Sequence, residues 1–427
     1  MASTLVATKL QVPQRRSSLV VRSRLTDRVA AGVRGALTVA SAPAGFGKTT
    51  ILSDWAAGAA PRAVAWVSLD ESEAQAPLFW QYVVTALGRA VPGAGAGVLP
   101  VLEAGQSATP SLLTAVLNDL ADVSDDVVLV LDDYHLVDGP DVAEGMAFLL
   151  DHRPPTLHVL LGTRADPALP LARLRARGDL TEIRAGDLRF TTDETTTYLA
   201  DVQGLAIGPD DVATLEARTE GWAAALQLAA LGIQGRDDVG AFVSGFAGTD
   251  RFVVDYLVDE VLSQQDDDVR GFLLRTSVLD RLCGPLCDAV LDATGSQPVL
   301  ESLDRANLFV VALDAERRWY RYHHLFGEVL RAHLRAEHPD EEVGLHLRAS
   351  RWYADAGEPA AAVRHALAAG DVDLAADLVE RAFPDLRRER KEATIRRWVD
   401  DFPPDVVSRR PVLAVGLIGG LMATNEF

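Results

Sequence analysis

The segment Ala42–Thr49 (APAGFGKT) has the residue types and the spacing that hold a phosphate group. The apolar residues 36–40 before it predict a strand, and the apolar spacing in 50–57 after it predicts a helix. In this context backbone N–H groups point at phosphate oxygens, a lysine reaches the β- and γ-phosphates, and a hydroxyl binds Mg²⁺. The lysine is Lys48 and the hydroxyl is that of Thr49, and the remaining phosphate contacts fall on the backbone of Ala44, Gly45, Phe46, Gly47 and Thr50. We therefore predict a nucleoside triphosphate site.

Two adjacent acids follow a second strand of the buried type. Val127–Leu131 is an unbroken apolar run, typical of a parallel strand that is covered on both faces, and Asp132 and Asp133 come directly after it. Ligands of open α/β sheets bind at the carboxyl ends of the strands. With a P-loop upstream, we predict that Asp132 holds Mg²⁺ and that Asp133 orients or deprotonates the attacking water.

An arginine follows a third strand. The apolar run 157–162 ends at Thr163 and Arg164, at the same predicted edge of the sheet. An arginine there is well placed to contact the γ-phosphate. On position alone, a surface salt bridge explains Arg164 equally well.

The length, charge and composition of the chain limit the classes of protein to which it can belong. A chain of 427 residues exceeds one hydrophobic core, which predicts two to four domains. The net charge of −20 argues against a broad face that grips nucleic acid. The longest apolar stretch, 412–423, is too short to span a membrane, so we expect a cytoplasmic protein. Cys283 and Cys287 have no neighbouring His or Cys pair and are expected to be buried thiols rather than zinc ligands.

The sequence pattern changes along the chain. Strands alternate with helices over the first 195 residues or so, which predicts an α/β P-loop domain with a parallel sheet and flanking helices. Residues 193–340 read as helices, except for a hairpin formed by 308–312 and 319–323. The last 85 residues resemble stacked helix-turn-helix repeats, and because no polar capping helix is in view, we expect the sequence to be cut within a repeat array.

Several segments together resemble the STAND class of signal-transduction P-loop ATPases, and specifically the large MalT-like regulators that usually end in a LuxR-type DNA-binding domain. The matching segments occur in the family's order across nearly the whole chain. They are Ser41–Thr50, Trp66–Asp70, Leu131–His135, Thr163–Arg164, Leu188–Phe190, Glu220–Ala223, Arg275–Leu279 and Tyr322–Phe326. The resemblance implies a P-loop domain (1–195), a helical lid (196–255), a winged-helix domain (256–342) and the start of a TPR-like array (343–427).

The resemblance also implies roles for residues outside the P-loop. Val21 and Arg22 match a segment whose backbone contacts adenine, and Arg164 matches an arginine that reads the γ-phosphate. Gly221 falls in a lid motif that packs over the base. His323 matches a winged-helix histidine that holds the β-phosphate of ADP, although His324 replaces the acid that follows it in related switches. On residue type alone, such a histidine pair is also typical of a helix start.

These implications predict an ATP/ADP switch with Mg²⁺ as cofactor and slow hydrolysis. An inducer, a small molecule or a protein, would bind the helical repeats, and ATP would favour self-association. The LuxR-type helix-turn-helix is not among these residues, so we expect no direct nucleic-acid binding, and no membrane, from this chain. It would be a truncated regulator or a form that lost its output domain.

Three alternatives remain open at this point. A ring-forming, AAA-like ATPase machine would share the P-loop and the acids but turn over fast. A small-molecule P-loop kinase would need an arginine-rich lid and an acceptor pocket. An interaction scaffold with a relict site would not need Lys48, Thr49, Asp132 and Asp133 all together.

Overall fold

The computed structural model describes residues 5–14, 19–60, 62–106, 108–236, 238–388, 392–400 and 402–424. These residues form two compact units. The first comprises Met1–Val253 together with Arg305–Phe309, and the second comprises Val254–Asp304 with Val310–Phe427. The finer division into four domains stays a prediction.

A five-stranded parallel sheet forms the centre of the first unit. Its strands are β1 (Leu37–Ser41), β2 (Ala63–Ser68), β3 (Val127–Asp132), β4 (Leu157–Thr163) and β5 (Leu180–Arg184). The spatial order is β2-β3-β4-β1-β5. β1, β3 and β4 are buried along their whole length, as their mainly apolar sequences predict. The parallel sheet is confirmed, and β5 is an edge strand that the sequence analysis did not identify.

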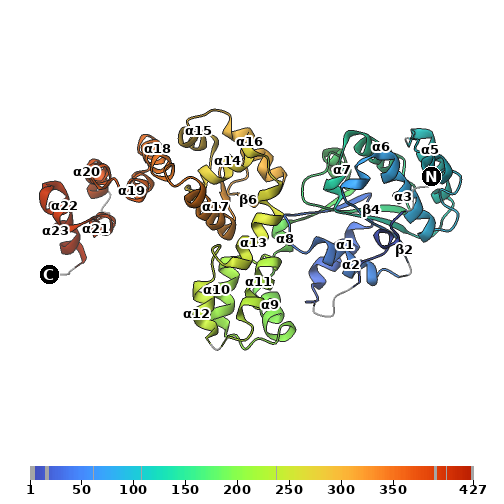
Figure 1. Cartoon of the computed structure of the whole chain (residues 1–427), viewed down its shortest axis with the longest axis horizontal. Coiled ribbons are helices and arrows are strands. Elements are labelled where there is room, and N and C mark those ends of the chain that lie inside the picture. Colours follow the sequence, from blue (N-terminus) through green and yellow to red (C-terminus); the bar gives the residue numbers. More distant parts are fainter. Residues whose placement is uncertain are drawn as a thin grey trace. The chain divides into compact units, whose positions relative to one another are not determined.

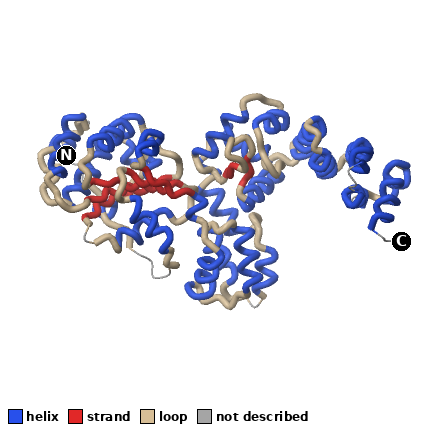
Figure 2. The backbone as a smooth tube through the Cα atoms, turned by 180° about the vertical axis from the view of Figure 1, so that it is seen from behind, coloured by secondary structure: helices blue, strands red, loops and turns tan. Residues whose placement is uncertain are grey.

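Helices cover both faces of this sheet. Figure 1 shows α1 (Ser23–Gly32) and α2 (Lys48–Ala57) on one face and α3 (Ala76–Ala90) and α6 (Pro140–His152) on the other. The red strands of Figure 2 lie between these layers. Shorter elements complete the layers: η1 (Ala7–Leu10), η2 (Glu71–Ala74), α4 (Leu99–Glu103), α5 (Pro110–Ala121), η3 (Tyr134–Leu136) and α7 (Leu171–Arg177). The core is built from the apolar side chains of the sheet and of α3, α5 and α6.

A helical region follows the sheet within the same unit. A capping box joins the Thr191 side chain to the backbone of Glu194 and the Glu194 carboxylate to the backbone of Thr191, at the start of α9. Its elements are α8 (Ala185–Leu188), α9 (Thr192–Thr196), the π-helix η4 (Thr197–Val202), α10 (Pro209–Thr219), α11 (Ala223–Ile233) and α12 (Val239–Gly245). The helix α13 (Arg251–Glu260) leads into the second unit.

The second unit begins with short helices and a β-hairpin. Its first elements are η5 (Leu262–Gln264), α14 (Asp267–Thr276), α15 (Gly284–Leu291), α16 (Ser296–Arg305), β6 (Val310–Ala312), β7 (Tyr320–Tyr322) and α17 (His324–Glu337). β6 and β7 pair antiparallel, which confirms the predicted hairpin. However, the first strand starts at Val310, because Asn307 and Phe309 adopt left-handed φ angles of 50° and 54° that break the extended run. Cys283 and Cys287 are free and buried, as expected.

The rest of the second unit is helical. It contains α18 (Glu342–Asp355), α19 (Pro359–Ala368), α20 (Val372–Arg388), α21 (Glu392–Asp400), α22 (Pro404–Arg409) and α23 (Pro411–Thr424). α18 packs on α19, and α19 packs on α20, as neighbours in a helical stack do. Within the described ranges, none of the helices combines the length and apolar character that crossing a bilayer requires.

Candidate nucleotide-binding site

The loop between β1 and α2 has the backbone conformation that a phosphate needs. Gly45 and Gly47 adopt left-handed φ angles of 74° and 82°, which cost glycine little and side chains more. α2 begins at Lys48, directly after Gly47. The orphan N–H groups at the start of this helix and its positive dipole end favour an anion. The predicted phosphate loop therefore exists as a turn into a helix N-terminus.

Lys48 folds back onto this loop. Its Nζ donates to the carbonyl oxygens of Ala42 at 2.8 Å and of Pro43 at 2.9 Å, and the side chain is buried. Burial lowers the pKa of Lys48 to about 8, while the negative charge of Asp133 raises it and the positive charge of Arg164 lowers it. A buried ammonium held only by two carbonyls is poised to exchange them for a more strongly charged partner.

The strand order explains why the other predicted side chains gather here. β4 lies between β1 and β3, with Ser41 beside Thr163 and Leu131 beside Leu161. Because the strands are parallel, the residues that follow β3 and β4 emerge at the same edge as the phosphate loop. The charges of Asp132, Asp133 and Arg164 all act on the pKa of Lys48. The structure thus brings together the predicted lysine, acids and arginine.

Asp132 has the environment of a cation ligand. It is 2% exposed, and burial, with the neighbouring Asp133 next, raises its pKa to about 6. A hydrogen bond from the Thr49 side chain opposes this rise in pKa. Among the described residues, Asp132 Oδ1 is a buried oxygen without a hydrogen-bond partner. A buried acceptor next to a threonine hydroxyl fits the oxygen-ligand set of Mg²⁺, which keeps several waters and phosphate oxygens as further ligands.

Gly162 leaves the space that this carboxylate occupies. A Cβ at position 162 would lie 2.5 Å from Asp132 Oδ1 and 3.1 Å from Leu52 Cδ1. Any side chain there would displace the carboxylate or the neighbouring helix α2. The sequence analysis assigned no role to this glycine, because nothing in a strand pattern distinguishes it from a small core residue.

Asp133 has a left-handed backbone conformation, and it lies beside the other charged residues of the site. Its φ of 58° and ψ of 38° are left-handed, which is uncommon for a residue with a side chain. Its carboxylate is partly exposed, and its Oδ1 lies 4.0 Å from Nδ1 of His135. Burial, together with the positive charges of Arg164 and Lys48, lowers the pKa of His135 to about 3. His135 is therefore neutral, and its ring belongs to the same charged cluster.

The lid motif contacts the phosphate loop directly. The indole Nε1 of Trp222 donates to the carbonyl of Ala44 at 3.0 Å, in a buried contact. The backbone N–H of Ala224, in the first turn of α11, donates to the carbonyl of Gly45 at 3.0 Å. The ring of Phe46 stacks on Trp222 with a centroid distance of 6.4 Å. The start of α11 thus fixes the outward-facing carbonyls of the loop.

Gly221 allows the lid motif to lie close to the backbone of Phe190. Its φ is 68°, and a Cβ there would lie 2.5 Å from the carbonyl oxygen of Phe190. The Gly221 carbonyl accepts a hydrogen bond from the backbone N–H of Phe190 at 2.8 Å. Gly221 therefore contacts the protein backbone in this structure, and its contact with a base stays a prediction.

The side chain of Arg22 anchors the predicted adenine segment. Its Nε lies 3.0 Å from Oε2 of Glu194, its Nη2 donates to the Leu188 carbonyl at 2.8 Å, and the guanidinium lies over the Phe190 ring. The side chain of Val21 is exposed. The structure therefore assigns the Arg22 side chain to packing, whereas the prediction concerned the backbone of Val21 and Arg22.

His323 lies in the second unit. It is 2% exposed and precedes α17, whose Gly327 N–H donates to its carbonyl at 2.9 Å. This placement at a helix start agrees with the alternative drawn from residue type. The predicted contact with a β-phosphate stays a prediction.

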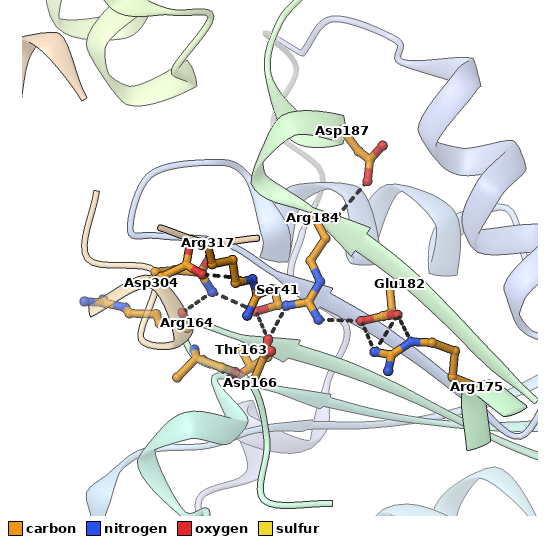
Figure 3. Close-up of polar contacts among 12 residues, drawn as sticks. Ser41, Thr163, Arg164, Asp166, Arg175, Glu182, Arg184, Asp187, Asp304 and Arg317 are labelled. Carbon is orange, nitrogen blue, oxygen red and sulfur yellow. Dashed lines mark hydrogen bonds and ion pairs between the residues drawn. The ribbon is translucent and has the colours of Figure 1, made fainter. Parts of the chain in front are cut away.

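A polar network beside the site escaped the sequence analysis. Figure 3 shows Ser41, Asp166 and Arg184, from the ends of three neighbouring chain segments, in contact with one another. Ser41 Oγ donates to Asp166 Oδ1 at 3.3 Å, and Arg184 forms an ion pair with the same carboxylate. Only the three-dimensional order of β4, β1 and β5 brings these residues together, so no spacing in the sequence indicates them.

The family model described as the MalT winged helix domain matches residues 258–342. A solved structure, the Walker-type ATPase PABY2304 of Pyrococcus abyssi, is similar with a TM-score of 0.53 and 14% identity. The similarity covers 74% of this chain and 97% of that one, and it supports the P-loop fold.

Curated relatives match nearly the whole chain. The HTH-type transcriptional regulator MalT of Serratia proteamaculans is 34% identical over 96% of this chain and 46% of its own length. MalT of Klebsiella pneumoniae is 36% identical over 88% of this chain and 42% of its own length. The serine/threonine-protein kinase PknK of Mycobacterium tuberculosis is 34% identical over 96% of this chain and 37% of its own length. The chain therefore spans less than half the length of these relatives.

Proposed function

Because this chain belongs to the MalT-like P-loop ATPases of the STAND class, we propose that it is the nucleotide-driven switch region of a transcriptional regulator. ADP holds the chain in an inactive form, ATP with Mg²⁺ favours an active form, and slow hydrolysis resets the switch. The observation that carries this proposal is the clustering of Lys48, Asp132 and Arg164 at one edge of the sheet.

Each residue of the cluster has a role in this proposal. Lys48 exchanges the carbonyls of Ala42 and Pro43 for β- and γ-phosphate oxygens, and the N–H groups of the loop bind the same phosphates. Thr49 and Asp132 hold Mg²⁺, which neutralises phosphate charge when bound. The backbone N–H groups that contribute are those of the loop 44–47 and of Thr49 and Thr50.

Turnover depends on Asp133. In this proposal Asp133, whose backbone is left-handed, orients or deprotonates the water that attacks the γ-phosphate. Arg164 contacts the γ-phosphate and supplies an interaction that ADP does not have. Only such a differential interaction can shift an equilibrium between two forms.

The difference in binding free energy that such a switch requires is modest. Changing a 1:99 population into 99:1 takes about 5.5 kcal/mol of differential binding. Charge-assisted hydrogen bonds contribute about 1.5–3 kcal/mol each, so a γ-phosphate bound by Arg164 and Lys48 supplies much of that difference. The inducer and self-association supply the rest.

The remaining predicted contacts belong to the same proposal. The backbone of Val21 and Arg22 and the lid glycine Gly221 contact the adenine base, and His323 contacts the β-phosphate of ADP. These roles come from the family resemblance. In this proposal the loop and the lid recognise the adenine nucleotide. Arg164 and His323 distinguish ATP from ADP.

The relatives differ in what such a switch controls. The similarity to MalT regulators supports a DNA-binding output, whereas the similarity to PknK supports the same region working beside a kinase. We propose that a small-molecule or protein inducer binds the helical repeats and that the ATP form self-associates. This chain would not itself contact DNA.

Turnover and size test the proposal against the alternative of a fast ATPase machine. We expect ATP turnover well below the median enzyme rate of about 10 s⁻¹ and an increase in molecular mass with a non-hydrolysable ATP analogue but not with ADP. Fast turnover in a constitutive ring would favour the machine instead. Absence of nucleotide binding would leave only an interaction scaffold.

A further inference from the structure

A five-residue strap, Arg305–Phe309, belongs to the first unit although it is far in sequence from the rest of that unit. The chain on either side of it belongs to the second unit, yet the strap itself packs within the first. Two of its residues, Asn307 and Phe309, adopt left-handed φ angles of 50° and 54°. Backbone strain of this kind persists only where surrounding contacts hold it.

The side chain of Asn307 bridges the phosphate-loop strand and the sensor arginine. Its Nδ2 donates to Ser41 Oγ at 2.9 Å, one residue before the loop, and to the backbone carbonyl of Arg164 at 2.9 Å. The Asp166 N–H donates to the Arg305 carbonyl at 3.1 Å. Figure 3 shows Ser41, Arg164 and Asp166 gathered at this point. The strap therefore fixes the backbone of 164–166 from outside the sheet.

The end of the strap contacts the other parts of the site. Phe309 is 3% exposed, and its ring centroid lies 6.1 Å from that of Phe46, in the phosphate loop, and 5.0 Å from that of Trp222, in the lid. The strap thus contacts the phosphate loop, the segment that contains Arg164, and the lid motif.

We propose that Asn307 is a positioning residue that holds Arg164 for contact with the γ-phosphate. Both amide protons of Asn307 are used on this edge, so the Arg164 backbone cannot move without moving the strap. The proposal rests on the proposed function, because it needs Arg164 to distinguish ATP from ADP.

The test compares affinities for Mg-ADP and for Mg-AMP-PNP, measured by calorimetry. Asn307→Gly keeps a residue that tolerates φ of 50° but removes both donors, so strain cannot explain its effect. We expect its preference for AMP-PNP over ADP to fall about tenfold, with ADP affinity within about twofold of wild type. Asn307→Asp, which has the same shape but no amide donors, should behave in the same way.

Asp292→Gly is the matched control. Asp292 is an exposed residue of the second unit with φ of 53°, and its replacement should leave the preference unchanged. A double variant, Asn307→Gly with Arg164→Ala, should lose no more preference than Arg164→Ala alone, because Asn307 acts through Arg164.

Additive losses in the double variant, or an unchanged preference in Asn307→Gly, would overturn the proposal while leaving the proposed function intact. An unchanged preference in Arg164→Ala would also overturn it, since no sensor would remain to be positioned. If wild type binds neither nucleotide, the proposed function fails, and the role of Asn307 fails with it.

Discussion

Replacing Gly162 by alanine tests whether the Asp132 carboxylate is placed for a cation. The added methyl carbon would lie 2.5 Å from Asp132 Oδ1 and 3.1 Å from Leu52 Cδ1, whereas ordinary contacts begin near 3.4 Å. The overlap of roughly 0.9 Å with the carboxylate must be relieved by rotating Asp132 or by shifting α2. Overpacking of this kind costs about 1–3 kcal/mol.

This loss of free energy should appear mainly as weaker binding of Mg²⁺. A rotated carboxylate cannot share a cation with Thr49, and 1.4 kcal/mol corresponds to a factor of about ten, so Mg²⁺-dependent ATP affinity should fall by about 10–100-fold. ADP affinity in EDTA should stay within about threefold of wild type, because the phosphate loop is unchanged. Calorimetry with and without Mg²⁺ separates the two quantities.

Gly186→Ala is the control for this variant. Position 186 is exposed in α8, and a Cβ there meets nothing within 4 Å, so the variant should bind as wild type does. The reasoning is refuted if Gly162→Ala retains wild-type Mg²⁺ dependence and wild-type thermal stability. It is also refuted if the nucleotide affinity of Gly162→Ala falls as much in EDTA as it does in Mg²⁺.

Three further predictions follow from the site. Asp133→Asn keeps a residue that tolerates the left-handed φ of 58°, so ATP should still bind while steady-state turnover stops; unchanged turnover would remove Asp133 from the mechanism. Mg-ATP affinity should be highest near about pH 7. It should fall toward lower pH as Asp132, with a pKa of about 6, takes up a proton that competes with Mg²⁺, and toward higher pH as Lys48, with a pKa of about 8, loses the proton that phosphate needs. In titrations across this range Asp132→Asn should lose the acidic limb, and persistence of that limb would contradict the assignment. Trp222→Phe leaves the Ala44 carbonyl without its indole donor, so the free energy of unfolding, measured with denaturant, should fall by about 1–3 kcal/mol, and an unchanged value would mean that water replaces the indole.

The strands and the residues that follow them could be predicted from the sequence. Mainly apolar runs identify β1, β3 and β4, because a strand covered on both faces buries nearly all of its side chains. Since parallel strands share one functional edge, Lys48, Asp132 and Arg164 could be expected to meet. β5 was missed because only Ile183 of its five residues is fully buried, as is common in an edge strand.

The contacts that hold the site in place could not be predicted. Gly162 matters because β4 lies beside Asp132, and Trp222 because α11 begins at the phosphate loop. Asn307 was placed just before a predicted strand, and its left-handed backbone instead turns its amide toward Ser41 and Arg164. Each of these roles depends on contacts between segments far apart in the chain, which periodicity and spacing do not encode.

The most direct test of the account is the affinity of the purified chain for ATP and ADP in Mg²⁺, with Lys48→Ala beside wild type. The buried ammonium of Lys48 donates to the carbonyls of Ala42 and Pro43, and we propose that it exchanges them for phosphate oxygens. The account predicts saturable binding of both nucleotides by wild type, tighter for ATP, and loss of both in a Lys48→Ala variant whose thermal unfolding shows that it is folded. Equal binding by wild type and Lys48→Ala, or none by wild type at millimolar nucleotide, would contradict it.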